Sequence, residues 1–402
     1  MIIFLRSLNS LIIKKGSAMK VGILTMRSKK NYGGTLQCYA LQNAVIDMGH
    51  ETNIIRFSLT QKNSFFRKLL ILADSFDDFS QYISLIKDSY LKKFSQKNQK
   101  NLSQAFLDAF ARFNDSELNY TELVDENNIY KVANQFDAIV VGSDQIWTGL
   151  TKKQLTYLLD WTPEFNGIRI SYSACSSDAK IPFITRNKAA ELFKKFHFLS
   201  VRDQNTFDLV KKTCGRVAEI TVDPTFLHGF EELYASDDEP AEPYVFVYII
   251  GSGIRGGHEK VIERIRERYG AIKIIAVAIS DQSLEAELFA DEVIHDASPQ
   301  QWVHLIKGAS FVYTDSFHGC VFAMKFQIEF LGYYSYAHRA TRLLDLKQRY
   351  GVGRNIVSSI NEVIKNDAIL TPIDYPKVNV LIENEINKSF TYLRNCLKGD
   401  RV

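Results

Sequence analysis

The chain has 402 residues, of which 46% are hydrophobic and 24% charged, and its 49 basic and 46 acidic residues leave a formal net charge of +3. This composition excludes a collagen-like, coiled-coil or largely disordered chain, and the balance of charge argues against a nucleic-acid binder, which needs a dense cationic face. A chain of this length has room for two domains of about 100–200 residues each.

The first 18 residues form an N-terminal extension ahead of the first predicted strand. Their two short apolar runs are interrupted by charged residues, so neither is long enough to span a bilayer. A second methionine, Met19, stands directly before the strand pattern at 20–24. This arrangement favours a mis-assigned start or a disordered tail, and a weak interfacial membrane anchor is the alternative.

Strand and helix patterns alternate over residues 19–235, which predicts a first domain with a parallel α/β sheet. An apolar run at 21–25 is followed by a glycine-containing break at 31–34 and by apolar residues at helical spacing between 36 and 45. Short apolar runs typical of further strands follow at 51–57, 138–141, 168–172 and 197–201.

Residues 58–130 interrupt this alternation. Their bulky apolar residues are scattered among Lys, Asn, Gln and Ser without strand runs, which predicts a helical insertion within the first domain. An acidic, proline-containing segment at 236–243 then predicts a connector between two domains.

A second α/β domain is predicted at 244–375. Helix patterns separate its strand patterns, which lie at 244–250, 272–279 and 311–313. Apolar residues that recur between 378 and 397 predict a final helix at 376–402.

Residues 314–319 are the best single indication of chemistry. They read Thr-Asp-Ser-Phe-His-Gly directly after a strand pattern, which places His318 in the first turn of the helix predicted at 317–326. An imidazole there can give or take a proton near neutral pH, although a lone histidine is more often structural. Lys325 lies further along the same helix and roughly on the same face, and a solvated surface role is its alternative.

Gly33 and Gly34 follow the first strand and precede a helix pattern. Because glycine has no Cβ, they could bring backbone N–H groups and a helix N-terminus close to an anion. A tight turn is the alternative, and the full Gly-x-Gly-x-x-Gly spacing is absent at this position. Asn31, Tyr32 and Gln37 beside them favour a ligand site.

Other polar residues follow predicted strands, at the edge where open α/β sheets bind ligands. Asp144 is a candidate base or sugar ligand with Trp147 nearby, and an Asx turn and core packing are the alternatives. Arg202 offers a planar fork for a carboxylate or phosphate, unless it forms an ordinary surface pair with Asp203. Asp223 precedes a proline and is expected to be a structural turn residue.

Arg339 and Arg342 share one helix face if residues 338–350 are helical, which makes them a candidate clamp for an oxyanion. A routine exposed basic face is the alternative.

The sequence contains no His-Glu-x-x-His pair and no cluster at metal-ligand spacing, so no metal is predicted. The five cysteines are scattered, without a Cys-x-x-Cys pair, as expected in a reducing cytoplasm.

Taken together, five motifs in order resemble the polysaccharide pyruvyltransferase family, and they lie at 31–37, 141–147, 200–203, 222–225 and 314–319. The resemblance spans most of the chain and implies a GT-B-like α/β fold, in which two Rossmann-type domains face a cleft. It also implies transfer of the enolpyruvyl group of phosphoenolpyruvate to two hydroxyls of a sugar, which forms a cyclic pyruvate ketal and releases phosphate. Phosphoenolpyruvate is then the donor substrate, and no further cofactor is expected.

This reaction divides the candidate residues between catalysis and the two substrates. His318 is the favoured proton carrier, and Asp144 is the second catalytic candidate. The expected donor ligands are Arg202, Ser316, Lys325, Arg339, Arg342, Gly33 and Gly34. The expected acceptor ligands are Asn31, Tyr32, Gln37 and Trp147. Some family members carry an arginine two residues before the matching histidine, where this chain has Ser316, so Arg339, Arg342 or Lys325 is expected to replace that charge.

The expected setting is the assembly of a capsular or other bacterial surface polysaccharide in the cytoplasm. The acceptor is expected to be a hexose such as galactose in a polysaccharide precursor, and a lipid-linked precursor would bring the enzyme to the inner face of the cytoplasmic membrane. Two alternatives stay open on the same architecture. One is a glycosyltransferase that uses a sugar nucleotide, and the other is a non-catalytic carbohydrate-binding component of a polysaccharide assembly complex.

Overall fold

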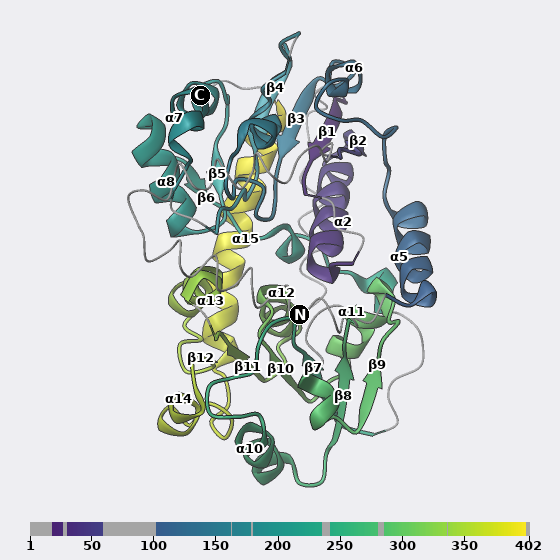
Figure 1. Cartoon of the computed structure of the whole chain (residues 1–402), viewed down its shortest axis with the longest axis vertical. Helices are drawn as coiled ribbons and strands as arrows, with labels where there is room; N and C mark the ends of the chain where they lie inside the picture. The colour runs from purple at the N-terminus through teal and green to yellow at the C-terminus, as the bar shows by residue number, and fades with distance from the viewer. Residues whose placement is uncertain are drawn as a thin grey trace.

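Two α/β lobes make up the described part of the chain (Figure 1). This computed structural model describes residues 18–26, 30–58, 102–161, 163–177, 180–234, 242–279, 285–335 and 337–398, with residues 337–339 described by their backbone alone. Most of the predicted N-terminal extension, the middle of the predicted insertion and most of the predicted connector lie outside these residues.

Parallel strands form the first lobe, as predicted: β1 (Lys20–Leu24), β2 (Glu51–Ile54), β3 (Ala138–Val141), β4 (Ile168–Ser171), β5 (Ser200–Val201) and β6 (Glu219–Ile220). The main sheet has the order β2-β1-β3-β4, and β5 and β6 form a small sheet of their own. All four residues of β3 are buried, as expected for an apolar strand that is covered on both faces.

Helices connect these strands, and side-chain caps mark several of their ends. Asp203 caps α8 by accepting a hydrogen bond from the Thr206 N–H, and Gly215 ends α8 in the left-handed conformation that glycine adopts without strain. The helices of this lobe are α2 (Tyr32–Asp47), α5 (Gln104–Glu117), α6 (Ile129–Ala133), η4 (Lys152–Leu158), α7 (Phe183–Lys194), α8 (Gln204–Cys214), η5 (Pro224–Phe226) and α9 (Glu231–Tyr234).

The described part of the predicted insertion is helical at α5 and α6. The segment between α5 and α6 is not helical. It runs beside β2 and forms isolated parallel bridges from Tyr120 to Ile54 and from Val124 to Phe57. Residues 59–101 of the insertion lie outside the described part.

The second lobe is a parallel sheet with the order β12-β11-β10-β7-β8-β9. Its strands are β7 (Tyr244–Tyr248), β8 (Lys273–Val277), β9 (Glu292–Ile294), β10 (Phe311–Thr314), β11 (Phe330–Tyr333) and β12 (Ile356–Val357). Its helices are α10 (Glu259–Tyr269), η6 (Glu285–Leu288), α11 (Pro299–Lys307), α12 (Phe317–Phe326), α13 (Ala337–Arg349), α14 (Ile360–Lys365) and α15 (Tyr375–Lys398).

Contacts made by α15 and by the start of α2 help to hold the lobes together. The long helix α15 runs from the second lobe along the first (Figure 1), where its Ser389 hydroxyl accepts a hydrogen bond from the Val222 N–H at 2.9 Å. At the start of α2, the Tyr32 ring stacks on Trp302 of α11 with 5.4 Å between ring centroids. The Tyr32 hydroxyl also donates to the Ala297 carbonyl at 2.7 Å. One hydrophobic core therefore continues from lobe to lobe.

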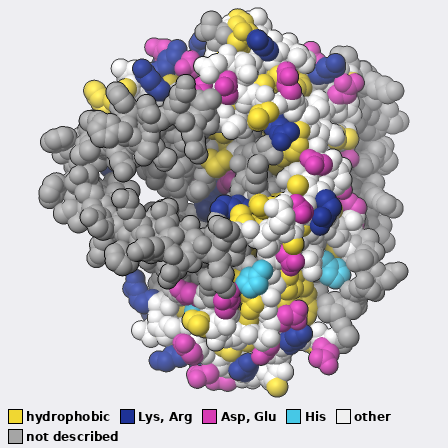
Figure 2. Space-filling view, turned by 45° about the vertical axis from the view of Figure 1, so that its right-hand side comes forward, with side chains coloured by type: hydrophobic (Ala, Val, Ile, Leu, Met, Phe, Trp, Pro, Cys, Tyr) yellow, Lys and Arg dark blue, Asp and Glu magenta, His cyan; other side chains and the backbone are white. Residues whose placement is uncertain are grey.

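The described surface carries both signs of charge. On the face shown in Figure 2, Lys and Arg side chains are interspersed with Asp and Glu. Among the described residues, no helix is long and apolar enough to cross a membrane.

Candidate active site

The carboxyl ends of the first lobe's strands and the start of α12 bring charged side chains to one place between the lobes. Asp144 follows β3, Arg202 follows β5 and Asp223 follows β6, while α12 carries His318 and α13 carries Arg342. These five side chains are called the inter-lobe cluster below. Parallel strands end at one edge of a sheet, so residues far apart in sequence meet there.

Arg202 lies at the centre of the inter-lobe cluster. Its guanidinium is only 2% exposed and donates from Nη1 to Asp223 Oδ2 at 2.6 Å, while Nη2 lies 3.6 Å from Asp144 Oδ1. The guanidinium also lies over the Phe317 ring at 4.6 Å from its centroid. Two carboxylates and one aromatic face therefore fix its position. The surface pair with Asp203 that the sequence left open is not formed, because Asp203 turns to cap α8.

His318 faces the same carboxylate from the second lobe. Ser316, two residues before His318, caps α12 by accepting a hydrogen bond from the Gly319 N–H, which holds His318 in the first turn. Nε2 of His318 lies 3.5 Å from Asp223 Oδ2, so this carboxylate serves both Arg202 and His318. Burial alone would raise the pKa of Asp223, but His318 and Arg202 outweigh it and hold that pKa well below its usual range.

Three buried nitrogens of this cluster have no hydrogen-bond partner among the described residues. They are Nε and Nη2 of Arg202 and Nε2 of His318. A buried donor without a partner costs about 1–3 kcal/mol, so native proteins rarely leave one unless a ligand or ion completes it. Two of these atoms lie near carboxylates, Nη2 of Arg202 at 3.6 Å from Asp144 and Nε2 of His318 at 3.5 Å from Asp223, so the cluster is a candidate site for an anionic ligand.

Gly33 allows the first lobe to approach His318. A Cβ built on Gly33 would lie 2.0 Å from the Nδ1 atom of His318, a separation that no side chain could tolerate. The start of α2 therefore packs directly on the imidazole. Gly34 serves the helix itself, since its N–H donates to the side chain of Asn31, the N-cap of α2, at 3.1 Å.

Arg342 and Asp144 complete the inter-lobe cluster. Nη1 of Arg342 lies 4.0 Å from Asp144 Oδ1, and its guanidinium lies 5.4 Å from the centroid of the Phe317 ring. Burial and the nearby charge of Arg202 lower the pKa of Arg342. The carboxylate of Asp144 thus stands between two guanidinium groups, where it offsets their mutual repulsion.

Three residues predicted to bind the acceptor are instead buried and hydrogen-bonded. Tyr32 is fully buried between the lobes, and Trp147 is fully buried and donates from Nε1 to the Tyr157 carbonyl. Gln37 donates to the Thr25 hydroxyl and accepts from the Ser143 N–H, so it supports the loop that carries Asp144. As placed here, none of the three exposes a surface to a sugar, and the prediction of direct contact is corrected.

One predicted donor ligand lies away from the cluster. Lys325 lies at the opposite end of α12 from His318, with its ammonium 5.7 Å from the centroid of the Phe230 ring. Burial lowers the pKa of Lys325 to about 8. The prediction mistook a shared helix face for a shared site, since a separation of two turns is about 10 Å along the axis. Arg339 belongs to α13, but its side chain lies outside the described part.

Sequence reasoning missed two contributors to the cluster. Asp223 was expected to be only a turn residue, and it does cap η5, yet its second oxygen holds Arg202. Phe317 was not considered, although both guanidinium groups lie over its ring. The Asp-Pro-Thr sequence after β6 was the available signal for Asp223, because it places a carboxylate at the same sheet edge as Arg202.

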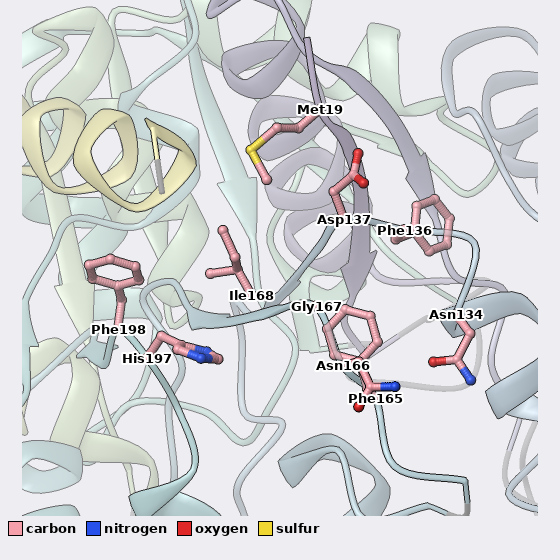
Figure 3. Close-up of a pocket in the computed structure, with 10 residues that line it drawn as sticks. All are labelled: Met19, Asn134, Phe136, Asp137, Phe165, Asn166, Gly167, Ile168, His197 and Phe198. Atoms are coloured by element: carbon pink, nitrogen blue, oxygen red, sulfur yellow. The ribbon is translucent and has the colours of Figure 1, made fainter. Parts of the chain in front are cut away.

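A cavity of about 750 Å³ lies elsewhere in the first lobe (Figure 3). Its lining includes Met19, Asp137, Gly167 and His197, which directly precede β1, β3 and β4 or approach β5. These positions are at the amino ends of the strands, opposite the edge that carries Arg202. Asp137 accepts a hydrogen bond from the Lys20 N–H there. The charged groups that suit an anion therefore lie in the inter-lobe cluster and not in this cavity.

Within the described residues, no group of three or more His, Cys, Asp or Glu side chains is arranged to hold a metal ion. The chemistry available in the inter-lobe cluster is that of its own side chains: two guanidinium groups for anions, an imidazole for proton transfer and a carboxylate, Asp144, that could accept a proton.

The fold is similar to that of two solved structures. UDP-GlcNAc 2-epimerase of Neisseria meningitidis, bound to UDP-GlcNAc, is 12% identical with a TM-score of 0.50, over 94% of this chain and 99% of that one. A protein of Listeria monocytogenes described as a UDP-N-acetylglucosamine 2-epimerase is 10% identical with a TM-score of 0.50, over 96% of this chain and 99% of that one. These likenesses show the fold alone, and they confirm the predicted GT-B arrangement.

The comparison with protein families agrees with the motifs in the sequence. No curated protein matches the chain. The family model described as polysaccharide pyruvyl transferase matches residues 31–338, a range that contains all five motifs and the described inter-lobe cluster except Arg342. Because this match covers most of the chain, the protein belongs to the polysaccharide pyruvyl transferase family.

Proposed function

We propose that the protein transfers the enolpyruvyl group of phosphoenolpyruvate to two hydroxyls of a sugar, forming a cyclic pyruvate ketal and releasing phosphate. Membership of the family supports pyruvyl transfer in polysaccharide synthesis. The observation that carries the choice of donor is the set of three unpartnered buried nitrogens on Arg202 and His318. They offer donors to a small, strongly anionic molecule.

The donor would lie with one anionic group against Arg202. Its Nε and Nη2 atoms form one edge of the guanidinium, and that edge matches the two oxygens of a carboxylate or phosphate. The second anionic group would face the starts of α12 and α2, whose helix dipoles favour negative charge. Arg342 would add a second positive charge, because it shares Asp144 with Arg202.

The reaction then needs one proton donor and one proton acceptor. His318 gives a proton to the methylene carbon of the enol, and positive charge develops on the adjacent carbon. The first sugar hydroxyl bonds to that carbon and loses its proton to Asp144. The second hydroxyl bonds to the same carbon and gives its proton to His318, which the first step left neutral, as the bond from carbon to the phosphate oxygen breaks. Arg202 and Arg342 stabilise the departing phosphate.

The acceptor is proposed to be a hexose such as galactose in a polysaccharide precursor. The corrected positions of Tyr32, Trp147 and Gln37 leave Asp144 and Asn31 as the acceptor candidates on the first lobe. Asn31 is exposed at the start of α2, so its amide is available to a sugar in addition to capping the helix.

The test is to incubate the purified chain with phosphoenolpyruvate and a panel of hexosides, nucleotide sugars and lipid-linked saccharides. We expect phosphate release that depends on the acceptor, and mass spectrometry should show a product enlarged by a pyruvate ketal. Parallel reactions supply a sugar nucleotide as donor. Glycosyl transfer in those reactions, without phosphate release from phosphoenolpyruvate, would replace the proposal by the glycosyltransferase alternative. No turnover with either donor would favour a binding component.

A further inference from the structure

The start of α7 presents two large apolar side chains to solvent. Phe183 is 77% exposed and Ile184 is 53% exposed, directly after Pro182. The rest of this helix is amphipathic in the usual way, since Thr185 and Ala189 are buried. Single exposed apolar residues are common on protein surfaces, but two consecutive ones at a helix tip are a feature that a partner surface would cover.

Basic residues are the charged residues nearest to this tip in sequence, with Asp178 and Glu191 at the edges of the stretch and Asp160 beside Lys188. Residues 180–190 contain three cations, Lys180, Arg186 and Lys188, and no acidic residue. All three cations are exposed, and the Arg186 guanidinium lies 6.0 Å from the centroid of the Phe183 ring. Lys188 is paired with Asp160 at 3.5 Å. The other two cations, Lys180 and Arg186, are also the ones nearest to the apolar pair in sequence. Exposed apolar residues with two exposed cations beside them in sequence match the surface of an anionic bilayer.

The direction of α7 places this tip on the side of the inter-lobe cluster. At the far end of the helix, Lys195 donates to Glu164 at 2.8 Å, and Glu164 also pairs with Arg169 near the start of β4. The helix therefore runs antiparallel to β4. Its first residue stands near the level of the carboxyl ends of the strands, the edge from which Asp144 and Arg202 project.

From these observations we infer that the Phe183–Ile184 tip, with Lys180 and Arg186, is a surface for attachment to an anionic membrane. The two apolar side chains enter the interfacial region, and the cations contact lipid phosphates. Attachment at this point brings the carboxyl-end edge of the first lobe's sheet toward the bilayer. If the proposed function holds, this attachment implies that the sugar acceptor is carried on a membrane lipid. That part of the inference rests on the proposed function.

Vesicle flotation of the full chain tests this surface without any substrate. Wild-type protein should float with vesicles of phosphatidylcholine and phosphatidylglycerol, bind far less to phosphatidylcholine alone, and be released by salt. The F183D/I184D variant should lose at least ~10-fold in vesicle partitioning. It removes the apolar area that would enter the membrane, and it adds negative charge. Arg186→Gln should weaken binding to anionic vesicles only.

The matched control is Leu288→Asp. Leu288 is 83% exposed, but its neighbours in η6 include Glu285 and Glu287, so it lacks the cations of the α7 tip. L288D should bind vesicles as the wild type does. Equal flotation of F183D/I184D and wild type, or no flotation of the wild type, would overturn the inference. A change in oligomeric state of F183D/I184D without a change in flotation would also overturn it, in favour of a protein interface.

The two proposals can fail separately. If the wild type floats but turns over no acceptor, the membrane surface stands and the proposed function falls. If acceptors are turned over, F183D/I184D should keep its rate on a water-soluble acceptor and lose at least ~10-fold on the same sugar carried by vesicles. Equal loss on both acceptors would show that the tip acts in folding or catalysis, and the inference would fail.

Discussion

Two buried histidines of the second lobe stand in similar local positions but in different networks. His258 directly precedes α10, and His318 lies in the first turn of α12. His258 shares a hydrogen bond with the Tyr313 hydroxyl through Nδ1 and with Glu285 through Nε2, both at 2.8 Å. His318 has no hydrogen-bond partner for Nε2 among the described residues and lies 3.5 Å from Asp223.

The difference is the one expected between a structural histidine and the catalytic histidine that we propose. A network in which both ring nitrogens are bonded stabilises the loop between β7 and α10 and leaves no group for a substrate. A network that leaves buried donors incomplete is less stable by itself, and such a cost persists where a ligand completes the bonds. Position at a helix start does not distinguish the two histidines; the partners of their ring nitrogens do.

The largest effect is expected when the imidazoles of His318 and His258 are removed one at a time. His318→Ala should lower kcat by about 10²–10⁴-fold, because the variant loses its proton donor. His258→Ala should leave kcat nearly unchanged and lower the free energy of unfolding by about 1–3 kcal/mol, because Tyr313 loses its partner. Steady-state phosphate release and denaturant unfolding measure the two effects. A folded H318A enzyme with near-normal turnover would remove His318 from the mechanism.

The next test disturbs the His318 ring without changing it. Gly33→Ala places a methyl group where His318 Nδ1 lies 2.0 Å away, so the ring or the lobe must move. A displacement of this kind should cost about 10²-fold in kcat. Gly34→Ala is the matched control, since the atoms nearest to its Cβ would belong to Asn31, at 3.4 Å or more. Comparable activity of the two variants would mean that close packing on the imidazole is unimportant.

A smaller effect, on the KM for phosphoenolpyruvate, is expected from replacing the planar guanidinium of Arg202. Arg202→Lys keeps the positive charge beside Asp223 but loses the planar edge with the unpartnered nitrogens. The KM for phosphoenolpyruvate should rise about 10–100-fold, corresponding to one charge-assisted hydrogen bond. Initial rates over a range of donor concentrations measure it. Arg216→Lys, which removes a guanidinium bonded to the Phe193 carbonyl, should leave that KM unchanged; a parallel rise in both variants would contradict a donor-binding role.

The smallest effect concerns the other end of α12 and should be visible only in stability. Burial lowers the pKa of Lys325 to about 8 from 10.5, so between these values the unfolded chain holds more protons than the folded one. Stability of the wild type should therefore rise with pH across this window, by about 2 kcal/mol for a side chain that is still partly exposed. Lys325→Met should lack this rise. Denaturant unfolding from pH 8 to 10 compares them, and parallel profiles would show that Lys325 titrates normally.

Much of the fold could be predicted because its signals are local. The apolar runs of β3 and β10 are continuous, since both faces of a parallel strand are covered, and the helix caps at Asn31 and Ser316 are short-range interactions. The strands β9, β11 and β12 were not predicted. Strands β9 and β12, at the edges of the sheet, have three and two residues and carry too few side chains to form a pattern.

The candidate site could be predicted only in part. His318, Arg202 and Asp144 were identified because each follows a strand, and a parallel sheet collects such positions at one edge. Tyr32 and Trp147 were predicted to contact a ligand because the sequence pattern of an aromatic residue beside a polar motif is the same whether its ring contacts a ligand or the core. Burial decides between these roles, and burial depends on residues such as Trp302 that are distant in sequence.

The sequence by itself determined the alternation of strands and helices, the family motifs and the placement of an imidazole at the start of α12, because each depends on residues within a few positions of one another. Only the tertiary structure decided that Asp223 serves both Arg202 and His318, that Gly33 packs on the imidazole, and that Lys325 is excluded from the cluster. These contacts join separate elements, and their geometry is set when the two lobes pack together.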